Sequence, residues 1–308
     1  MPRYRFVKKV GLLGLLLLLA VYMAMSVVVW SRQKHYIFMP QRELANTPED
    51  FGMKFEDVFI AIQPENNTSE RLHAWWIPAD NDYGRTLLYL HGSAFNIAAN
   101  IEHARRFQRL GFSVLLVSYR GYGRSDGSFP SEANMYADAR AAWRYLTGDR
   151  RRQAGRIYIY GHSLGGAVAI DLAVDHPRAA GLIVEGTFTS ISDMGRLDSL
   201  FRLLPIDLLV TQRFDSQAKI DRVAVPVLIL HGTRDDLVPV DMARRLFAKA
   251  KPPKILKLIL GGGHNNSARI GGQIYLDAIA AFVSDTFSPQ TPDKRPAMAN
   301  SSRIHDPL

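Results

Sequence analysis

Short apolar runs rich in Val, Ile, Leu and Tyr recur along the chain from residue 57 onward, and helical patterns separate most of them. The apolar runs lie at 57–62, 72–77, 86–91, 113–119, 156–161, 180–185, 225–231 and 254–260. The helical patterns lie at 97–110, 132–147, 164–176 and 240–249. Strands that alternate with helices predict a mostly parallel sheet of eight strands with helices on both faces. We expect the first two strands to form an antiparallel edge.

An uncharged segment precedes this alternation. From Val10 to Trp30 no residue is charged. About twenty residues at a rise of about 1.5 Å each span a hydrocarbon core of about 30 Å. The segment therefore predicts either an amino-terminal transmembrane helix or a signal peptide.

The flanking residues favour an uncleaved anchor. Apolar residues continue through Val27–Trp30, beyond the small-residue site at Ala24–Ser26, and Trp30 suits a membrane interface. The basic residues are Arg3, Arg5, Lys8 and Lys9 before the segment, and Arg32 and Lys34 after it. This bias favours a single-pass protein with a cytoplasmic amino terminus and a periplasmic or otherwise extracytoplasmic domain. Cleavage after Ser26, which would give a secreted protein, is the alternative.

The patterns divide the chain into four parts. We expect an anchor at 1–32, a linker at 33–54, one α/β domain at 55–286 and a disordered tail at 287–308, because the tail is polar and Pro-rich. With 308 residues, 47% of them hydrophobic, the chain can bury one substantial core.

Composition excludes other classes of protein. The chain has no cysteine, which excludes disulfides and thiolate metal ligands. Its histidines are scattered, so we expect no metal. The formal net charge is +9, but the charges are dispersed and no recognition motif is present. We therefore expect membrane lipid, rather than nucleic acid, to be the anionic partner.

The most informative motif is GxSxG at 161–165. It follows the apolar run Ile157–Tyr160 and precedes the small-residue helical stretch Ala167–Ile170. A sharp strand-to-helix turn lifts a serine oxygen above the sheet, and its glycines avoid collisions with neighbouring backbone. Ser163 is therefore the candidate nucleophile, and an ordinary turn between a strand and a helix is the alternative.

A serine hydroxyl needs a base to take its proton and an acid to orient that base. Where this motif occurs in hydrolases, the acid follows the serine and the histidine comes last. Only His264 and His305 then qualify, and His305 lies in the tail. His264 follows a predicted strand and the glycines at 261–263, so we expect it to be the base; a surface histidine is the alternative.

The best candidate acid is Asp235, on the loop after the strand that ends at His231. Spacing alone leaves Asp236 open, and Glu185 is a more distant choice. A solvated turn is the alternative role for the two aspartates. The oxyanion of an acyl-transfer intermediate needs backbone N–H donors, for which we expect Leu164 and Ser93, with Ala94 as the neighbouring choice. We expect His91 to support the structure of the Ser93 loop.

Over roughly residues 55 to 286 the chain resembles the α/β hydrolases, in particular the single-span, membrane-anchored α/β hydrolase domain serine hydrolases. The matching segments are HGSAFN at 91–96, SYRGYGRSDG at 118–127, GHSLGG at 161–166, EGTFTS at 185–190, HGTRDDLVP at 231–239 and GGGHNN at 261–266. The resemblance implies an α/β-hydrolase fold, a triad of Ser163, Asp235 and His264, and an oxyanion hole at Ser93 and Leu164. Many relatives carry Asn-Ala-Gly where this chain has Ser93–Phe95, so their acyl-chain preference does not transfer.

Residues 190–220 interrupt the alternation and predict a short cap over the site. Their apolar side chains are typical of a helix packed on the domain's own core; lining of an acyl pocket and contact with a membrane are the alternatives. These residues are Met194, Leu197, Leu200, Phe201, Leu203, Leu204, Pro205, Ile206, Leu208, Leu209 and Val210.

Together these patterns favour a membrane-anchored serine hydrolase that cleaves carboxylic esters or acyl thioesters through an acyl-enzyme and needs no cofactor. The expected substrate is a small-molecule or lipid-like acyl compound or an acylated protein. A serine peptidase of the same fold and a membrane-tethered binding protein without turnover are the alternatives.

Overall fold

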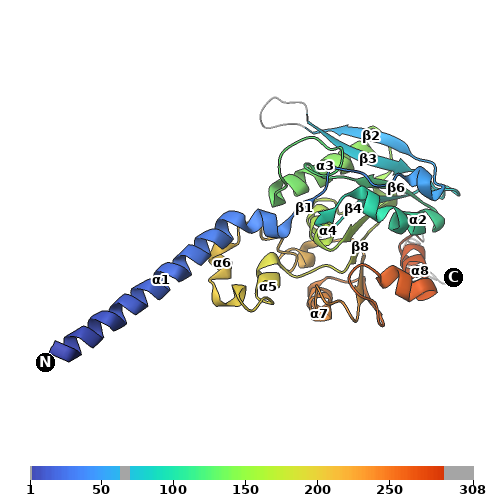
Figure 1. Cartoon of the computed structure of the whole chain (residues 1–308). Coiled ribbons are helices and arrows are strands. Elements are labelled where there is room, and N and C mark those ends of the chain that lie inside the picture. Colours follow the sequence, from blue (N-terminus) through green and yellow to red (C-terminus); the bar gives the residue numbers. More distant parts are fainter. Residues whose placement is uncertain (1, 63–69, 288–308) are drawn as a thin grey trace, which may run out of the picture.

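A computed structural model describes residues 2–62 and 70–287, and an eight-stranded sheet forms its centre (Figure 1). The strand order across the sheet is β10-β9-β8-β7-β4-β6-β3-β2. The strands are β2 (Glu56–Ala61), β3 (Arg71–Ile77), β4 (Arg85–Leu90), β6 (Phe112–Val117), β7 (Ile157–His162), β8 (Gly181–Glu185), β9 (Val227–Gly232) and β10 (Lys254–Ile259). The eight strands predicted from the apolar runs are confirmed.

The sheet is mostly parallel. Strand β3 pairs antiparallel with both β2 and β6, and every other pairing within the sheet is parallel. The predicted antiparallel edge is therefore present. The carboxyl ends of the parallel strands meet at one edge of the sheet, which is where the loops of an α/β protein form a site.

Both faces of the sheet are buried because successive side chains of each strand point to opposite faces. In β4, Leu88 and Leu90 belong to one hydrophobic cluster, whereas Leu87 and Tyr89 belong to the other. The same alternation occurs in β6 and β9. These strands therefore read as continuous apolar runs in the sequence.

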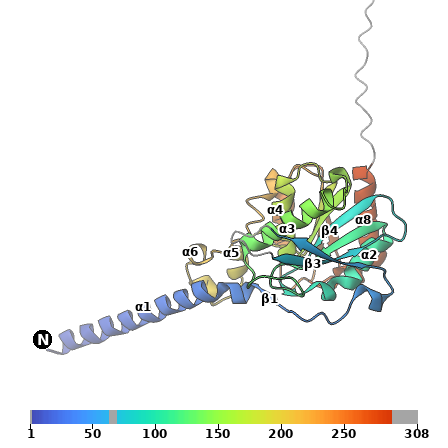
Figure 2. The same cartoon turned by 90° about the horizontal axis from the view of Figure 1, so that it is seen from above.

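Helices cover the two faces. Helices α3 (Glu132–Thr147), α4 (Leu164–Asp175) and α7 (Val240–Lys249) contribute to one cluster, and α2 (Ile101–Arg109) and α8 (Ser267–Phe287) contribute to the other. Figure 2 shows α3 and α4 on the side of the body opposite to α2. The expected tail lies, from residue 288 on, outside the described residues.

The amino-terminal helix α1 (Pro2–Ile37) projects away from the body in both views (Figures 1 and 2). Its segment Phe6–Ile37 is long and apolar enough to cross a membrane, and an 18-residue stretch within it has a mean hydropathy of 2.7. The helix continues past residue 32, the expected end of the anchor. It does so because its last turns pack on the body, where Gln33 is buried and accepts hydrogen bonds from the backbone N–H groups of Thr211 and Gln212 at 2.8 and 3.2 Å.

The cap segment, residues 190–220, packs beside α1. It contains α5 (Ile191–Gly195), the 3-10 helix η4 (Phe201–Leu203) and α6 (Ile206–Leu209), and the 3-10 helix η5 (Ile220–Arg222) follows. Its apolar residues Leu204, Ile206 and Val210 form a small cluster with Met25 and Val29 of α1. This packing was not foreseen from the sequence, because the pattern does not say which apolar partner an exposed insertion will find.

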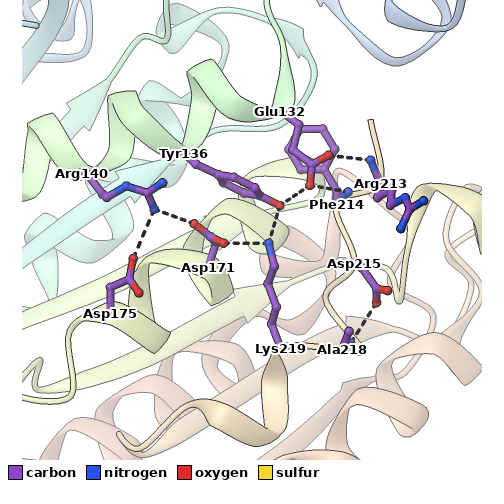
Figure 3. Close-up of polar contacts among 10 residues, drawn as sticks. All are labelled: Glu132, Tyr136, Arg140, Asp171, Asp175, Arg213, Phe214, Asp215, Ala218 and Lys219. Carbon is purple, nitrogen blue, oxygen red and sulfur yellow. Dashed lines mark hydrogen bonds and ion pairs between the residues drawn. The ribbon is translucent and has the colours of Figure 1, made fainter. Parts of the chain in front are cut away.

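A polar network fastens the cap segment to α3 and α4 (Figure 3). The carboxylate of Glu132 accepts hydrogen bonds from the backbone N–H groups of Arg213 and Phe214, at 2.6 and 2.8 Å, and from the Tyr136 hydroxyl at 2.7 Å. Lys219 donates to the Tyr136 hydroxyl at 3.0 Å and to Asp171 at 2.7 Å. The carboxylate of Glu132 therefore accepts three hydrogen bonds. Two of them come from the backbone of the cap segment and hold its end against α3.

A two-stranded sheet, which the sequence did not predict, links α1 to the body. Strand β1 (Met39–Pro40) pairs in parallel with β5 (Ala94–Phe95). The Met39 N–H donates to the Ser93 carbonyl at 3.0 Å. Strands of two residues are too short to produce a recognisable alternation.

We expect Glu132→Ala to lower the free energy of unfolding by about 1 to 3 kcal/mol, because it leaves backbone donors of the cap segment unpaired. Denaturant titration of the detergent-solubilised chain measures this, and trypsin should cleave faster after Arg213. Glu43→Ala, at an exposed glutamate, is the matched control. Equal unfolding midpoints for the two variants would contradict the role of Glu132.

Candidate active site

Ser163 lies at the sharp turn between β7 and α4. Its backbone has φ 54° and ψ −122°, a left-handed conformation that non-glycine residues rarely adopt. Such a residue costs of order 1–3 kcal/mol of strain and persists only where the surroundings enforce it. The turn is held by the hydrogen bond from the Ser163 N–H to the Glu185 carbonyl at 2.9 Å. The side chain is thereby lifted to the carboxyl edge of the sheet.

The glycines of the turn are required by close backbone contacts. A Cβ atom at Gly165 would lie 2.1 Å from the carbonyl oxygen of Leu90, at the end of β4. A Cβ atom at Gly161 would lie 2.1 Å from the carbonyl oxygen of Gly165. A side chain at Gly165 would push the turn away from β4, and a side chain at Gly161 would push the start of α4 away from β7.

The structure brings Ser163, His264 and Asp235 together in a continuous hydrogen-bonded chain. Nε2 of His264 lies 3.0 Å from Oγ of Ser163, and Nδ1 lies 2.8 Å from Oδ2 of Asp235. His264 stands on the loop after β10, and its carbonyl accepts a hydrogen bond from the ring of His162 at 3.0 Å. Ser163 and His264 are both largely buried. The fold therefore brings three residues that are far apart in the sequence into direct contact.

Asp235, rather than Asp236, contacts the histidine. Its other oxygen accepts hydrogen bonds from the backbone N–H groups of Leu237 at 3.0 Å and Val238 at 2.8 Å. Burial alone would raise the pKa of Asp235, but the hydrogen bonds from His264 and Val238 outweigh it and lower the pKa. Asp236 is exposed. Asp235 thus stays ionised, which suits a group that orients an imidazole.

Ser93 and Ser163 line the same cavity. The Ser93 carbonyl is occupied by the N–H of Met39 and by the Tyr122 hydroxyl, the latter at 2.7 Å. Leu164 is the first residue of α4, so its N–H belongs to the first turn, where helix donors lack intrahelical acceptors.

His91 is fully buried, and burial lowers its pKa to about 4. Its ring donates to the Gly92 carbonyl at 2.7 Å, which braces the loop as expected.

Glu185 does not contact His264 but forms a buried network below the cavity. Its Oε2 accepts hydrogen bonds from the hydroxyls of Tyr160 and Tyr275, at 2.8 and 2.6 Å, and lies 3.2 Å from Nε2 of His103. Burial would raise the pKa of Glu185, but the charge and hydrogen bond of His103, with the Tyr275 hydroxyl, lower it to about 2. Sequence analysis missed this network, since Tyr275 in a helix reads as an ordinary core aromatic.

The cavity around Ser163 has a volume of about 420 Å³. Its apolar lining includes Met39, Phe95 and Leu237, each about half exposed. Arg106 and Arg269 line its polar part. The cap segment contributes no side chain to this lining among the described residues, so the expected cover over the site is not formed. Instead, the cap segment packs on α1 and α3.

A cluster of three or more His, Asp or Glu side chains suitable for a metal ion is absent from residues 2–62 and 70–287. The imidazole of His264 lies within hydrogen-bonding distance of the Ser163 hydroxyl.

Comparison with known proteins identifies the family. Residues 83–214 match the family model described as serine aminopeptidase, S33. The α/β hydrolase domain-containing protein WAV2 of Arabidopsis thaliana is 32% identical over 261 residues, which cover 79% of this chain and 83% of that protein. This chain belongs to the α/β hydrolase family. The predicted family is thereby confirmed.

Two further proteins are similar to this chain. An uncharacterised protein of Mycobacterium tuberculosis is 36% identical over 259 residues, covering 84% of this chain and 89% of that protein. The structure of an esterase from Pyrococcus furiosus aligns with a TM-score of 0.67 at 20% identity, covering 81% of this chain and 98% of the esterase. A likeness at 20% identity shows that the two proteins share a fold.

The Glu185 network of this α/β hydrolase predicts a pH dependence of stability. The pKa of Glu185 is depressed from its ordinary value of 4.5 to about 2 in the folded chain. The resulting stabilisation, on the order of a few kcal/mol, is present above pH 4.5 and is lost as the pH falls toward 2. We expect Glu185→Gln to flatten the pH dependence of the unfolding free energy over this window.

Denaturant titrations at several pH values measure this slope. Glu43→Gln, at an exposed site, should keep the slope of the parent. A Glu185→Gln variant with an unchanged slope would mean that Glu185 is not the buried anion of the folded state.

Proposed function

We propose that this chain is a membrane-anchored serine hydrolase that cleaves carboxylic ester or acyl-thioester bonds through an acyl-enzyme on Ser163. One observation carries the proposal: Ser163, His264 and Asp235 form an unbroken hydrogen-bonded chain, with distances of 3.0 and 2.8 Å, at the wall of a cavity. Hydrolases of this fold use that arrangement to make a hydroxyl nucleophilic.

In the proposed reaction, Oγ of Ser163 attacks the acyl carbonyl carbon while Nε2 of His264 takes the hydroxyl proton. Asp235 holds the imidazole in the required tautomer and stabilises the imidazolium. The N–H groups of Ser93 and Leu164 donate to the oxyanion of the tetrahedral intermediate. His264 then protonates the leaving alcohol or thiol. A water molecule, deprotonated by His264, hydrolyses the acyl-enzyme and regenerates Ser163. No cofactor takes part in these steps.

The cavity supports an acyl substrate that is lipid-like. Met39, Phe95 and Leu237 provide a half-exposed apolar lining beside the nucleophile. Met39 lies two residues after the end of α1, so the proposed anchor leads into the wall of the cavity. A lipid-like compound or an acylated protein at the membrane surface would meet this opening.

We propose that α1 is an uncleaved anchor with its amino terminus in the cytoplasm. The helix continues unbroken through Ser26, and both Ser26 and Gln33 are buried against the rest of the chain. Signal peptides are removed, whereas this segment contributes packing to the folded domain. The cytoplasmic amino terminus rests on the excess of basic residues that precede the apolar segment.

A peptidase activity is the alternative suggested by the description of the matching family model. An aminopeptidase needs a free carboxylate for the substrate ammonium group. Glu185 already accepts two tyrosine hydroxyls, and Glu102 pairs with Arg105. The two glutamates of the lining balance the charge of its two arginines, so the cavity offers an ammonium group no net negative charge.

We expect a fluorophosphonate probe to label the full-length chain and to leave the Ser163→Ala variant unlabelled.

Asp235→Asn should lower kcat/KM for p-nitrophenyl esters by roughly 10³-fold or more, since the imidazole loses its orienting anion. Asp236→Asn is the matched control and should stay within about two-fold of the parent. Equal losses for the two aspartate variants would overturn the assignment, and a parent that resists labelling would favour a binding protein.

Phe95→Ala should raise KM for long-chain p-nitrophenyl esters by roughly 5- to 30-fold, because about 1 to 2 kcal/mol of apolar contact is lost. The KM for the acetate ester, whose acyl group is too short to reach Phe95, should be almost unchanged. Phe59→Ala, at a partly exposed phenylalanine of edge strand β2, is the control. Losses of equal size for short and long chains would argue against contact between Phe95 and the acyl group.

A further inference from the structure

Large apolar side chains of the cap segment remain exposed. Leu203 is 70% and Leu208 is 83% exposed, and Leu197 and Leu200 are about half exposed. The opposite side of the same segment is buried, through Leu204, Ile206 and Val210. We call the four exposed leucines the leucine face. Several exposed leucines on one short segment mark a contact surface.

The leucine face belongs to a segment that docks on the apolar part of α1. Met25 and Val29 pack against the cap segment, and both precede the first cation after the apolar stretch, Arg32. At about 1.5 Å per residue, Met25 lies about 10 Å toward the apolar end of the helix from Arg32. Figures 1 and 2 both show α5 and α6 beside α1, on the side of the body from which it projects. If α1 crosses a bilayer, the cap segment therefore reaches the level of the lipid headgroups.

Charged and aromatic residues around this junction match a lipid interface. Arg32, Lys34 and Arg202 are exposed, and none of them forms an ion pair with an acidic side chain of the described residues. Trp30 and Tyr36 are also exposed. Basic side chains attract anionic headgroups, and such aromatic residues are enriched at the boundary between lipid and water.

We infer that the leucine face is a second membrane contact, which lies in the headgroup and upper acyl region of a phospholipid bilayer beside α1. The inference rests on the proposed anchoring of α1. The continuity of this face with the helix argues for lipid rather than for a second copy of the chain. Gln33 and Glu132 join α1, the cap segment and α3 into one unit, so two contacts would set the tilt of the domain on the membrane. The opening at Met39 would then stay close to the bilayer surface.

The absence of cysteine from the sequence makes a direct test possible. Single variants Leu203→Cys and Leu208→Cys carry an environment-sensitive fluorophore, and the full chain is reconstituted into vesicles of phosphatidylcholine and phosphatidylglycerol. A nitroxide near the top of the lipid acyl chain serves as the quencher. Leu17→Cys in α1 reports anchoring. Ile274→Cys, 59% exposed on α8 at the far side of the body from α1, is the matched control.

We expect blue-shifted emission and a loss of intensity with nitroxide lipid at Leu203 and Leu208, and neither change at Ile274. Quenching at Leu17 without quenching at the two cap positions would overturn the second contact while leaving the anchor intact. Absence of quenching at Leu17 would overturn the anchor and the inference together. A blue shift that disappears on dilution in detergent would assign the face to a second copy instead. None of these readouts involves catalysis, so they are separate from the test of Ser163.

Discussion

The close approach of the turn at Gly165 to the end of β4 is the contact on which the site depends. With a carbonyl oxygen of Leu90 only 2.1 Å from where a Cβ atom would stand, the main chain of the turn lies directly against the central strand. That contact allows α4 to start immediately above the sheet and holds Ser163 in its left-handed conformation. At this height Ser163 lies within hydrogen-bonding distance of His264, which contacts Asp235 in turn.

A second constraint is the burial of one carboxylate below the cavity. Glu185 lies at the end of β8, next to β7, and receives hydrogen bonds from residues of β7 and α8. Its carbonyl also accepts the Ser163 N–H. An ionised group is tolerated there because several donors replace water. The same residue thus ties the turn to the helix that follows the His264 loop.

The amino-terminal helix determines where the cap segment packs. Segment 190–220 has the apolar composition of a lid, yet its buried side meets α1 through Met25 and Val29. The hydrogen bonds of Gln33 and Glu132 then hold the segment between the helix and α3. The cavity at Ser163 is bordered instead by Met39 and Phe95, which the paired strands β1 and β5 supply.

The sequence by itself determined the eight strands and the candidate residues. A sheet buried on both faces produces continuous apolar runs, and the turn at Ser163 tolerates only glycine two residues to either side of the serine. Order along the chain pointed to His264. Tertiary structure alone decided between Asp235 and Asp236, since adjacent residues on a loop differ only in which one turns inward. It also decided the pairing of β1 with β5, the partners of Glu185 and the docking of the cap segment on α1. These features depend on contacts between residues far apart in the chain, and such contacts leave no periodic signal in the sequence.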